Sequence, residues 1–597
     1  MTATWEKFGL YARTLWHLRP GQIAWRLKRM AQRRLSVRLP DEDGYSSAHF
    51  DGAALQRLRE FLAVAREHGL DADADPLALR DDIFTFLNRT VDCEAAMPWQ
   101  DKSLPLLWRY QLHGFRTARM LAATAFSDAT ALGDAARAAH WVDDWLRHNP
   151  PGSAVAWDSH PTSDRLFNWV LSSAAFGAGY GATAERCTMQ ALWLEARIEH
   201  DLGANHVLKE VMALALAAEV TANAALRQRA WAMVEEEVAE QILPDGGHYE
   251  LSPLYHAQAL FDGLVLRAGA AAPPKFFDNA LRRMTHFLED ILHPDGDIPL
   301  FGDAALGETM QGRALVALAR TVLGDKPREE PRPALPDSGF YVLGSGDNRM
   351  ILKAAGPNPP YQPGHAHGDP FTFELSVAGR RLIVDGGCNG YAESTLRGYC
   401  RSVRAHNTVR INGQEPMEAW DVFRVARRHR ITAADWEVGG HASILRGICR
   451  WPQGWTQTRY TRYDRDTGFW VVVDRVDGAG PLTVESYLHF YPGTEVTESG
   501  GAWVARRDGA HLGILPEGAD RVELVEGAHA PDQGWYCPRF GVADPAPTLV
   551  LHAKGTARLT CGWMLFPPEG ADRVVAALEA VHREMRQEPP PAEQGQG

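Results

Sequence analysis

The sequence predicts a multi-domain α + β protein, in which helical hairpins arranged in layers or a ring are followed by an antiparallel β-sandwich. Three observations predict this class. The chain has 597 residues, 45% of them apolar, which is too long for a single hydrophobic core. Apolar residues recur three and four positions apart from about residue 50 to 325. Beyond a proline-rich segment they alternate in short runs that are bounded by turn residues.

The first half of the chain is expected to be helical throughout. Residues 1–45 form a basic helical segment, and residues 46–325 form a helical domain. Stretches such as "ALQRLREFLAVAREHGL" and "AARAAHWVDDWLRHN" have the helical period, and "NPPG", "PDGG" and "HPDGD" separate the helices. The sequence shows no strand pattern between them.

The second half is expected to consist of strands. Residues 326–337 contain four prolines, which favour an extended linker. Residues 338–570 contain runs such as "GFYVLGSG", "FTFELSVAG" and "GFWVVVDRV", which are typical of antiparallel strands joined by tight turns. Residues 571–597 are expected to end the chain as a short helix and a disordered tail.

Charge and cysteine content exclude several classes of protein. A net charge of −13 disfavours binding to nucleic acid at long range. Seven cysteines without CxxC spacing indicate a reducing compartment. The N-terminus lacks the apolar core of a secretory signal, and no run of about 20 apolar residues could span a membrane. We therefore expect a cytoplasmic protein without a membrane span, a periplasmic location being less favoured, and the oligomeric state is not indicated.

Two histidines in "GHAHGDP" are the first candidate site residues. His365 and His367 would share one face of an extended chain. A metal ion with nitrogen and oxygen donors needs about three protein ligands, and Asp385 and His406 are the further candidates. Pairing about the turn after the first strand sets Asp385 several residues short of His367. The alternative is therefore a histidine pair that hydrogen-bonds to backbone.

Several motifs in the chain resemble those of the heparinase II/III-type polysaccharide lyases. "YQPGHAHGDPFTFELSVAGRRLIVDGG" and "RSVRAHNTVRINGQ" carry the resemblance, and "FLNRTVD", "WDSHPTSDRLFNW", "GANHVLKE" and "ILPDGGHYELSPLYH" precede them in the order of the family. The resemblance implies an (α/α) toroid joined to an antiparallel β-sandwich. It places His365 in the active site. It also implies that His367, Asp385 and His406 hold a structural divalent metal, with zinc expected and manganese or calcium as alternatives.

The resemblance assigns further catalytic residues to the helical half. Asn205 and His206 would contact the carboxylate of the substrate, and Glu210 would orient His206 from one helical turn away. From the residues alone, Asn205 is expected to be a helix cap. Of the two tyrosines that follow, Tyr255 fits the proton-transferring position better than Tyr249.

A second group of residues is expected to contact the substrate: Trp157, His160, Arg165, Tyr249, Arg401 and Arg404. The first three look like part of a sugar-binding rim. The last two lie in a basic stretch, with a net charge of +5 from residue 397 to 430, and would contact carboxylate or sulfate groups. Each has an ordinary alternative, which is packing between helices, a core tyrosine or a solvated surface arginine.

The expected reaction is β-elimination in a uronic-acid-containing polysaccharide or oligosaccharide, of glycosaminoglycan or alginate type. Neutralising the uronate carboxylate would stabilise the carbanion formed at C5, and Tyr255 and His365 would divide the roles of base and acid. A glycoside hydrolase that uses Asp297 and Asp303 is one alternative. A polysaccharide-binding protein without turnover is the other.

Overall fold

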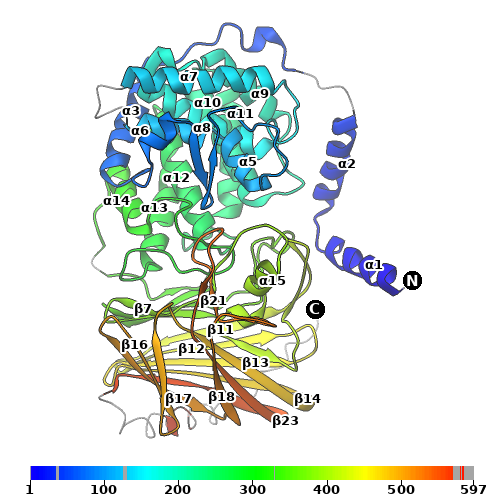
Figure 1. Cartoon of the computed structure of the whole chain (residues 1–597), viewed down its shortest axis with the longest axis vertical. Coiled ribbons are helices and arrows are strands. Elements are labelled where there is room, and N and C mark those ends of the chain that lie inside the picture. Colours follow the sequence, from blue (N-terminus) through cyan, green and yellow to red (C-terminus); the bar gives the residue numbers. More distant parts are fainter. Residues whose placement is uncertain are drawn as a thin grey trace.

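An α-helical toroid and an antiparallel β-sandwich lie one above the other, and two N-terminal helices run along one side (Figure 1). The computed structural model describes residues 2–34, 39–124, 131–328 and 330–568, together with residues 578, 579, 581 and 583. Most of the expected C-terminal helix and tail therefore lies outside the described residues. Within the described ranges, no helix combines the length and the apolar character needed to cross a membrane.

The toroid is built from helical hairpins around three inner helices. Its helices are α3 (Gly52–Glu67), α4 (Pro76–Arg80), α5 (Leu106–His113), α6 (Arg116–Thr124), α7 (Ala131–His148), α8 (Ser159–Phe176), α9 (Ala184–Glu195), α10 (Ala204–Val220), α11 (Ala224–Gln241), α12 (Pro253–Gly269), α13 (Lys275–Asp290) and α14 (Gly312–Leu323), with 3₁₀ turns η1 (Glu42–Gly44) and η2 (Gly177–Tyr180). Helices α8, α10 and α12 are buried on nearly every side, because small and apolar residues occupy both of their faces. Asp51, Asp75 and Asn223 cap α3, α4 and α11 by accepting backbone N–H groups.

A β-hairpin interrupts the helices, and the expectation of an unbroken helical half is wrong at this point. β1 (Ile83–Phe86) pairs antiparallel with β2 (Arg89–Asp92). Leu87 and Asn88 form the two-residue turn, and both have positive φ, as the twist of a tight hairpin requires. Phe84 anchors the hairpin in the toroid core.

Two antiparallel sheets form the sandwich. The smaller sheet contains, in spatial order, β3 (Ala334–Leu335), β4 (Phe340–Ser345), β5 (Asn348–Lys353), β6 (Phe373–Val377) and β7 (Arg380–Ile383). The larger sheet contains, in spatial order, β11 (Arg430–Val438), β12 (Ala442–Arg450), β13 (Thr456–Asp464), β14 (Phe469–His489), β23 (Thr548–Phe566), β17 (Ala510–Glu517), β16 (Ala502–Arg507) and β15 (Glu495–Ser499), with β8 (Val409–Ile411) on β14 and β18 (Arg521–Val525) on β23. Apolar residues of both sheets, such as Leu352 and Trp563, share one core.

Shorter elements cover the end of the sandwich that faces the toroid. They are the hairpin of β9 (Met417–Trp420) and β10 (Arg424–Arg428), the pairs of β19 (Ala528–His529) with β20 (Asp532–Gln533) and of β21 (Trp535–Tyr536) with β22 (Asp544–Pro545), the helix α15 (Thr395–Arg401) and the turn η3 (Val403–Ala405). Helix α15 departs from the expectation of strands alone. It begins where the Ser394 side chain accepts the N–H of Arg397.

The two N-terminal helices contact both domains. They are α1 (Thr2–Leu15) and α2 (Pro20–Arg34). Arg13 of α1 forms a 2.6 Å ion pair with Glu418 in the hairpin of β9 and β10. Arg29 of α2 forms a 3.1 Å ion pair with Asp201 of the toroid. The basic N-terminal segment therefore bridges the toroid and the sandwich.

Candidate active site

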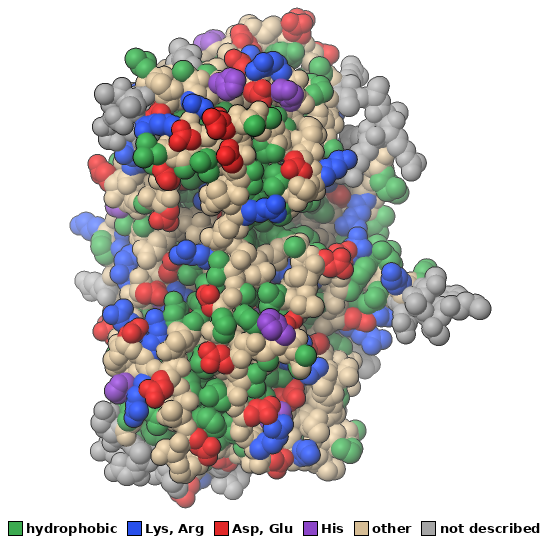
Figure 2. Space-filling view, viewed as in Figure 1, with side chains coloured by type: hydrophobic (Ala, Val, Ile, Leu, Met, Phe, Trp, Pro, Cys, Tyr) green, Lys and Arg blue, Asp and Glu red, His purple; other side chains and the backbone are tan. Residues whose placement is uncertain are grey.

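The first turns of the three inner helices meet at one end of the toroid. His160 is the second residue of α8, Asn205 the second of α10 and Tyr255 the third of α12. All three line a cavity of about 790 Å³ that also reaches Arg539 of the sandwich, and Figure 2 shows the surface hollowed between the two domains. The cap interpretation of Asn205 is wrong, because Gly203 occupies that position. Since backbone N–H groups point out of the start of a helix, this end of the toroid favours an anion.

Tyr255 and His365 come together across the domain boundary. Their rings stack with centroids 4.0 Å apart and planes inclined by 29°. The Tyr255 hydroxyl is also hydrogen-bonded to the hydroxyl of Tyr391, which lies in the loop after β7. Burial, and then the charge of Asp303, raise the pKa of Tyr255 well above its usual value. Its phenol is therefore protonated in the free protein.

The Asp303 carboxylate orients His365. It accepts hydrogen bonds from Nδ1 of His365 at 2.9 Å, from Nε2 of His367 at 2.8 Å and from both terminal nitrogens of Arg397. Burial alone would raise the pKa of Asp303, but Arg397 and the two imidazoles hold it well below its ordinary range. The charged carboxylate keeps the proton of His365 on Nδ1. No described residue forms a hydrogen bond with its Nε2.

Local backbone geometry places Asp303 against the histidines. The segment after α13 turns at Gly302, where φ is +60°. A Cβ atom on Gly302 would lie 2.8 Å from the carbonyl oxygen of His365, and the N–H of Asp303 donates to the same oxygen at 3.0 Å. Glycine alone fits both the conformation and the close approach. The toroid segment and the histidine segment are therefore in direct backbone contact.

Glu199 orients His206, and the expected role of Glu210 is wrong. Nδ1 of His206 donates to Glu199 at 2.6 Å, whereas Glu210 accepts the backbone N–H of Glu199 at 2.8 Å. Arg29 of α2 pairs with the other oxygen of Glu199, so the N-terminal segment supports the site as well. Glu199, His206 and Glu210 are close enough together to hold a metal ion, but Arg29 already supplies the cation at this position.

His160 and His206 differ in charge although their rings lie 4.7 Å apart. Burial lowers the pKa of His160 to about 4. Burial also opposes the charge of His206, but the hydrogen bond and the charge of Glu199 outweigh it and raise the pKa above its usual value. His206 therefore holds a proton more readily than an ordinary histidine and lies beside an imidazole that is neutral.

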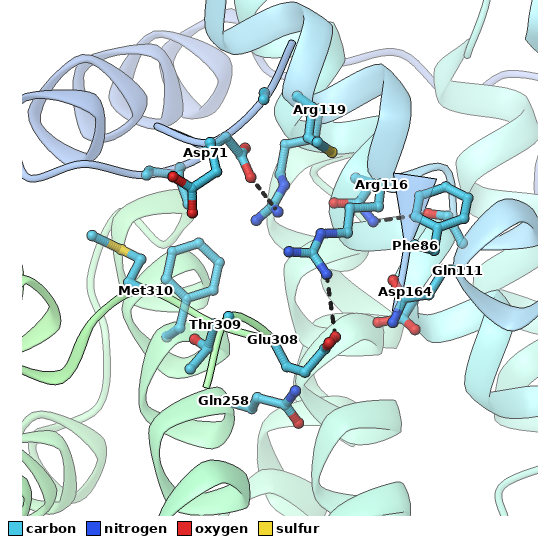
Figure 3. Close-up of a pocket in the computed structure, with 18 of the residues that line it drawn as sticks. Asp71, Phe86, Gln111, Arg116, Arg119, Asp164, Gln258, Glu308, Thr309 and Met310 are labelled. Carbon is cyan, nitrogen blue, oxygen red and sulfur yellow. Dashed lines mark hydrogen bonds and ion pairs between the residues drawn. The ribbon is translucent and has the colours of Figure 1, made fainter. Parts of the chain in front are cut away.

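Charged side chains in the cavity wall are paired with one another. Figure 3 shows Arg119 directed at Asp71 and Arg116 directed at Glu308, at 2.9 Å and 3.6 Å. Lys209 lies between two aspartates of α8 and α12, at 2.9 Å and 2.8 Å. The lining contains six acidic residues against four Lys and Arg residues, so the wall has no net positive charge.

His367, Asp385 and His406 are buried together in the sandwich. The rings of His367 and His406 lie 5.2 Å apart, and Asp385 accepts a hydrogen bond from Nδ1 of His406 at 2.9 Å. A bulge between β6 and β7 shifts the register there, so that Asp385 reaches Thr372 at 2.8 Å. Among the described residues, Nδ1 of His367 and Nε2 of His406 are buried without a partner. Two such imidazoles and a carboxylate are donors of the kind that zinc takes. Among the described residues, however, the group whose ligand atoms all lie within 4.8 Å of one another is Glu199, His206 and Glu210 and not these three.

Trp157 and Arg165 do not form a rim at the cavity. They lie in the toroid core with 4% and 0% of their surface exposed. The indole N–H of Trp157 donates to the Asn149 carbonyl. Arg165 donates to Gln190 and stacks on Trp145. Because the polar groups of both residues are used inside the core, the expected contact with substrate is wrong for them.

Tyr249, Arg401 and Arg404 also lie away from the cavity wall. The Tyr249 hydroxyl is hydrogen-bonded to that of Tyr361 at 2.7 Å. Arg401 is buried and donates to the Val422 carbonyl at 3.0 Å, so it supports a loop of the sandwich. Arg404 is half-buried in η3. Of the expected substrate contacts, only His160 lines the cavity. The hydroxyl of Tyr249 and a terminal nitrogen of Arg401 are used inside the protein, whereas the expected contact of Arg404 stays a prediction.

Four site residues were missed by sequence reasoning or assigned a different role. Asp303 was considered only as a hydrolase acid, and Glu199, Tyr391 and Arg397 were not considered as site residues. Asp303 contacts a histidine 62 positions away, a distance that no local pattern reveals. The only signal for Asp303 was an acid that follows a glycine turn in "HPDGDIPLFGDAA".

Comparison with known proteins identifies the family. Residues 82–323 match the heparinase II/III N-terminus, and residues 327–577 match the heparinase II/III-like C-terminal domain. The chain belongs to the heparinase II/III family. This family member is 27% identical over 478 residues to the heparin-sulfate lyase of Pedobacter heparinus, covering 70% of this chain and 68% of that protein. It is 24% identical over 470 residues to the heparin-sulfate lyase of Bacteroides stercoris, covering 67% of this chain and 66% of that protein.

Two solved structures share the fold of this family member. A crystal structure of heparinase III superposes with a TM-score of 0.65 at 16% identity, covering 90% of this chain and 88% of that one. A mutant of the heparan sulfate lyase HepC from Pedobacter heparinus superposes with a TM-score of 0.58 at 21% identity, covering 84% of this chain and 83% of that one. The expected fold class, an (α/α) toroid followed by an antiparallel β-sandwich, is confirmed.

Replacement of Asp303 tests its position at the centre of the site. Asp303→Asn leaves Arg397 buried without a charged partner, so the free energy of unfolding should fall by about 3–5 kcal/mol. His365 also loses its fixed proton, so kcat should fall by at least about a hundredfold. Denaturant unfolding and steady-state kinetics measure the two effects. Asp297→Asn on the same segment is the control, and an Asp303→Asn enzyme with normal kcat would contradict the assignment.

Replacement of Glu199 tests the charge of His206. The pKa of His206 is raised, so its positive charge should persist below that pKa and be lost as the pH rises through it. KM should therefore be low at acidic pH and increase above the ordinary histidine range. In Glu199→Gln the pKa of His206 should be lowered by burial, because the opposing charge of Glu199 is gone. The rise in KM should therefore occur at lower pH. Glu195→Gln, which removes an exposed partner of Arg229, should leave the KM profile unchanged.

Proposed function

We propose that this protein is a polysaccharide lyase that cleaves uronic-acid-containing glycans of the glycosaminoglycan type by β-elimination, leaving 4,5-unsaturated uronate ends. The observation that carries the proposal is the stacked pair of Tyr255 and His365 at a cavity where three helices begin. Family membership and the similarity to two heparin-sulfate lyases support it. The partner is accordingly an anionic polysaccharide or oligosaccharide.

The carboxylate of the substrate is the first group that the site must neutralise. An ionised carboxylate next to C5 opposes removal of the C5 proton, because the carbanion adds a second negative charge. Asn205 and the protonated His206 lie on the first turn of α10, whose N-terminus adds partial positive charge. These donors stabilise the enolate-like intermediate, and removing one such donor typically costs about 3–4 kcal/mol.

His365 and Tyr255 divide the two proton transfers. Asp303 keeps a proton on Nδ1 of His365, so Nε2 has the lone pair that accepts the C5 proton. Tyr255 begins as a neutral phenol and donates its proton to the departing O4. Its hydrogen bond with Tyr391 offers a route for a proton to return to Tyr255 after the products leave.

A glycoside hydrolase is not favoured, because Asp303 is unsuited to the role of its acid or base. Both oxygens of Asp303 accept hydrogen bonds from the sandwich, and the residue is fully buried. A hydrolase needs two carboxyl groups that reach the glycosidic oxygen and a water or the sugar. A binding protein without turnover is not favoured either, since the groups that transfer protons lie together at the cavity.

We further propose that His367, Asp385 and His406 hold a divalent metal ion, with zinc expected and manganese or calcium as alternatives. Two buried imidazole nitrogens without partners support this assignment. Burial lowers the pKa of His367 to about 3, which keeps this ring neutral as a ligand requires. For His406, burial also lowers the pKa, but Asp385 outweighs it and raises the pKa above its usual value, so a metal ion would have to compete with a proton there. When bound, the ion would supply a structural link within the sandwich next to His365.

Replacement of Tyr255 tests the reaction type. Tyr255→Phe keeps the ring that stacks on His365 but removes the hydroxyl, so kcat should fall by about 10²–10⁴-fold while KM changes little. The assay follows ultraviolet absorbance of the unsaturated uronate with heparan sulfate, hyaluronan, chondroitin and alginate as substrates. Tyr249→Phe is the matched control and should retain kcat. Cleavage of any of these polymers to saturated reducing ends would contradict the lyase assignment.

Removal of the metal tests the proposed structural ion. Dialysis against a chelator should lower the melting temperature and kcat together, because an ion that binds only the folded state stabilises it. Readdition of zinc should restore both. Elemental analysis verifies the metal content at each step. A metal-free protein with unchanged melting temperature would show that no structural ion is bound.

A further inference from the structure

Helix α2 has two unlike faces. Gln22 and Arg29 face the toroid, where Gln22 donates to the Asp201 carbonyl at 3.3 Å and Arg29 pairs with Glu199 and Asp201. A second stripe lies roughly 130° further around the helix axis. It consists of Ile23, Leu27 and Met30, with exposed fractions of 44%, 63% and 55%. The helix therefore contacts the toroid through Gln22, Arg29 and the ring of Trp25, which lies 4.7 Å from that of His200. It turns the stripe of Ile23, Leu27 and Met30 away from the toroid.

This arrangement is the reverse of that in an ordinary surface helix, whose apolar stripe covers the core. Trp16, in the turn between the end of α1 at Leu15 and the start of α2, is 86% exposed and is a further apolar side chain in this segment. Contiguous exposed apolar residues on a folded protein usually mark a surface that another body covers. The residues matched by the family begin at 82, so α1 and α2 lie outside the matched ranges.

The charge of this segment differs from that of the rest of the chain. Residues 1–40 contain nine basic residues against the single acidic Glu6, a net charge of +8, so the remaining residues carry −21 of the total of −13. Lys7 and Lys28 are exposed. Figure 2 shows basic and hydrophobic side chains interspersed along the edge where these helices lie. The occupant of this surface must therefore be apolar and anionic at once.

We propose that α1 and α2 dock this protein on an anionic lipid surface. Exposed aliphatic side chains on one face with basic residues nearby are features of a helix that lies in the membrane interface. Arg13, Arg19 and Arg29 are already paired with acids of the protein body. Exposed lysines such as Lys7 and Lys28 are therefore the residues that attract anionic headgroups. A second copy paired through the same two helices would bring the same positive charge and repel. A polysaccharide offers no hydrocarbon to cover Ile23, Leu27 and Met30.

Docking in this way would hold the active site close to the lipid. Helix α2 contacts Glu199, which in turn orients His206. With its apolar stripe in the interface, α2 places that wall of the toroid about one helix diameter, ~10 Å, from the surface. The enzyme would then meet glycan chains at a membrane rather than only in free solution.

Sedimentation of the full chain with vesicles tests the proposal. The protein should bind vesicles of phosphatidylcholine containing about one quarter phosphatidylglycerol, and not vesicles of phosphatidylcholine alone. Joint replacement by Ile23→Ser, Leu27→Ser and Met30→Ser should weaken this binding at least about tenfold, because no apolar stripe remains to enter the interface. Lys7→Gln with Lys28→Gln should weaken it several-fold, as should added salt.

A matched triple variant serves as the control. Leu77→Ser, Leu106→Ser and Val438→Ser replace exposed apolar residues elsewhere and should bind vesicles like the unchanged protein. Light scattering of all variants reports self-association. The proposal is overturned if the unchanged protein does not bind anionic vesicles or if the stripe variant binds them equally well. It is also overturned if the unchanged protein is a dimer and the stripe variant is a monomer. The stripe would then be the interface between two copies of the chain.

Discussion

One buried carboxylate joins the two domains and orders the active site. Asp303 belongs to the toroid, yet its acceptor positions are filled by His365, His367 and Arg397 of the sandwich. A buried charge that loses its partners is strongly destabilising. The domains are therefore most stable in the arrangement that brings the sandwich donors to Asp303. The same contact brings His365 to Tyr255 at 4.0 Å. Docking of the domains and positioning of the catalytic pair are thus one interaction.

The site attracts an anion without a strongly positive cavity. The protein carries −13 overall, and Arg119 and Lys209 in the cavity wall are each paired with acids. What remains is local, namely the starts of α8, α10 and α12, the Arg539 side chain at the cavity, and His206, whose pKa is raised by Glu199. The partial positive charge of a helix N-terminus falls off within about one turn. It therefore stabilises a single carboxylate placed beside it more than the charges spread along a polymer. This arrangement favours orientation of one uronate over strong binding of a whole polymer.

The sequence predicted the fold, because it is carried by motifs and by periodicity, and it named a set of proposed catalytic residues that the structure places near one another. Asn205, His206, Tyr255 and His365 all lie where the resemblance placed them, at or beside the cavity. What failed depended on tertiary contacts. Trp157 and Arg165 were assigned from residue type, but which face of a helix meets the core decides their role. Glu210 has the helical spacing for His206, yet the partner is Glu199 from the preceding turn.

The spacing of the two histidines has a physical explanation in the shared carboxylate. His365 and His367 both donate to Asp303, but His365 uses Nδ1 and His367 uses Nε2. The lone pair of His365 is therefore on Nε2, beside Tyr255, where the proposed proton transfer takes place. The lone pair of His367 is on Nδ1, beside His406, where it can bind the proposed metal ion. A single intervening residue lets one carboxylate set both tautomers. A lone histidine, or a pair on opposite faces of the chain, would leave one of the two functions without an oriented ring.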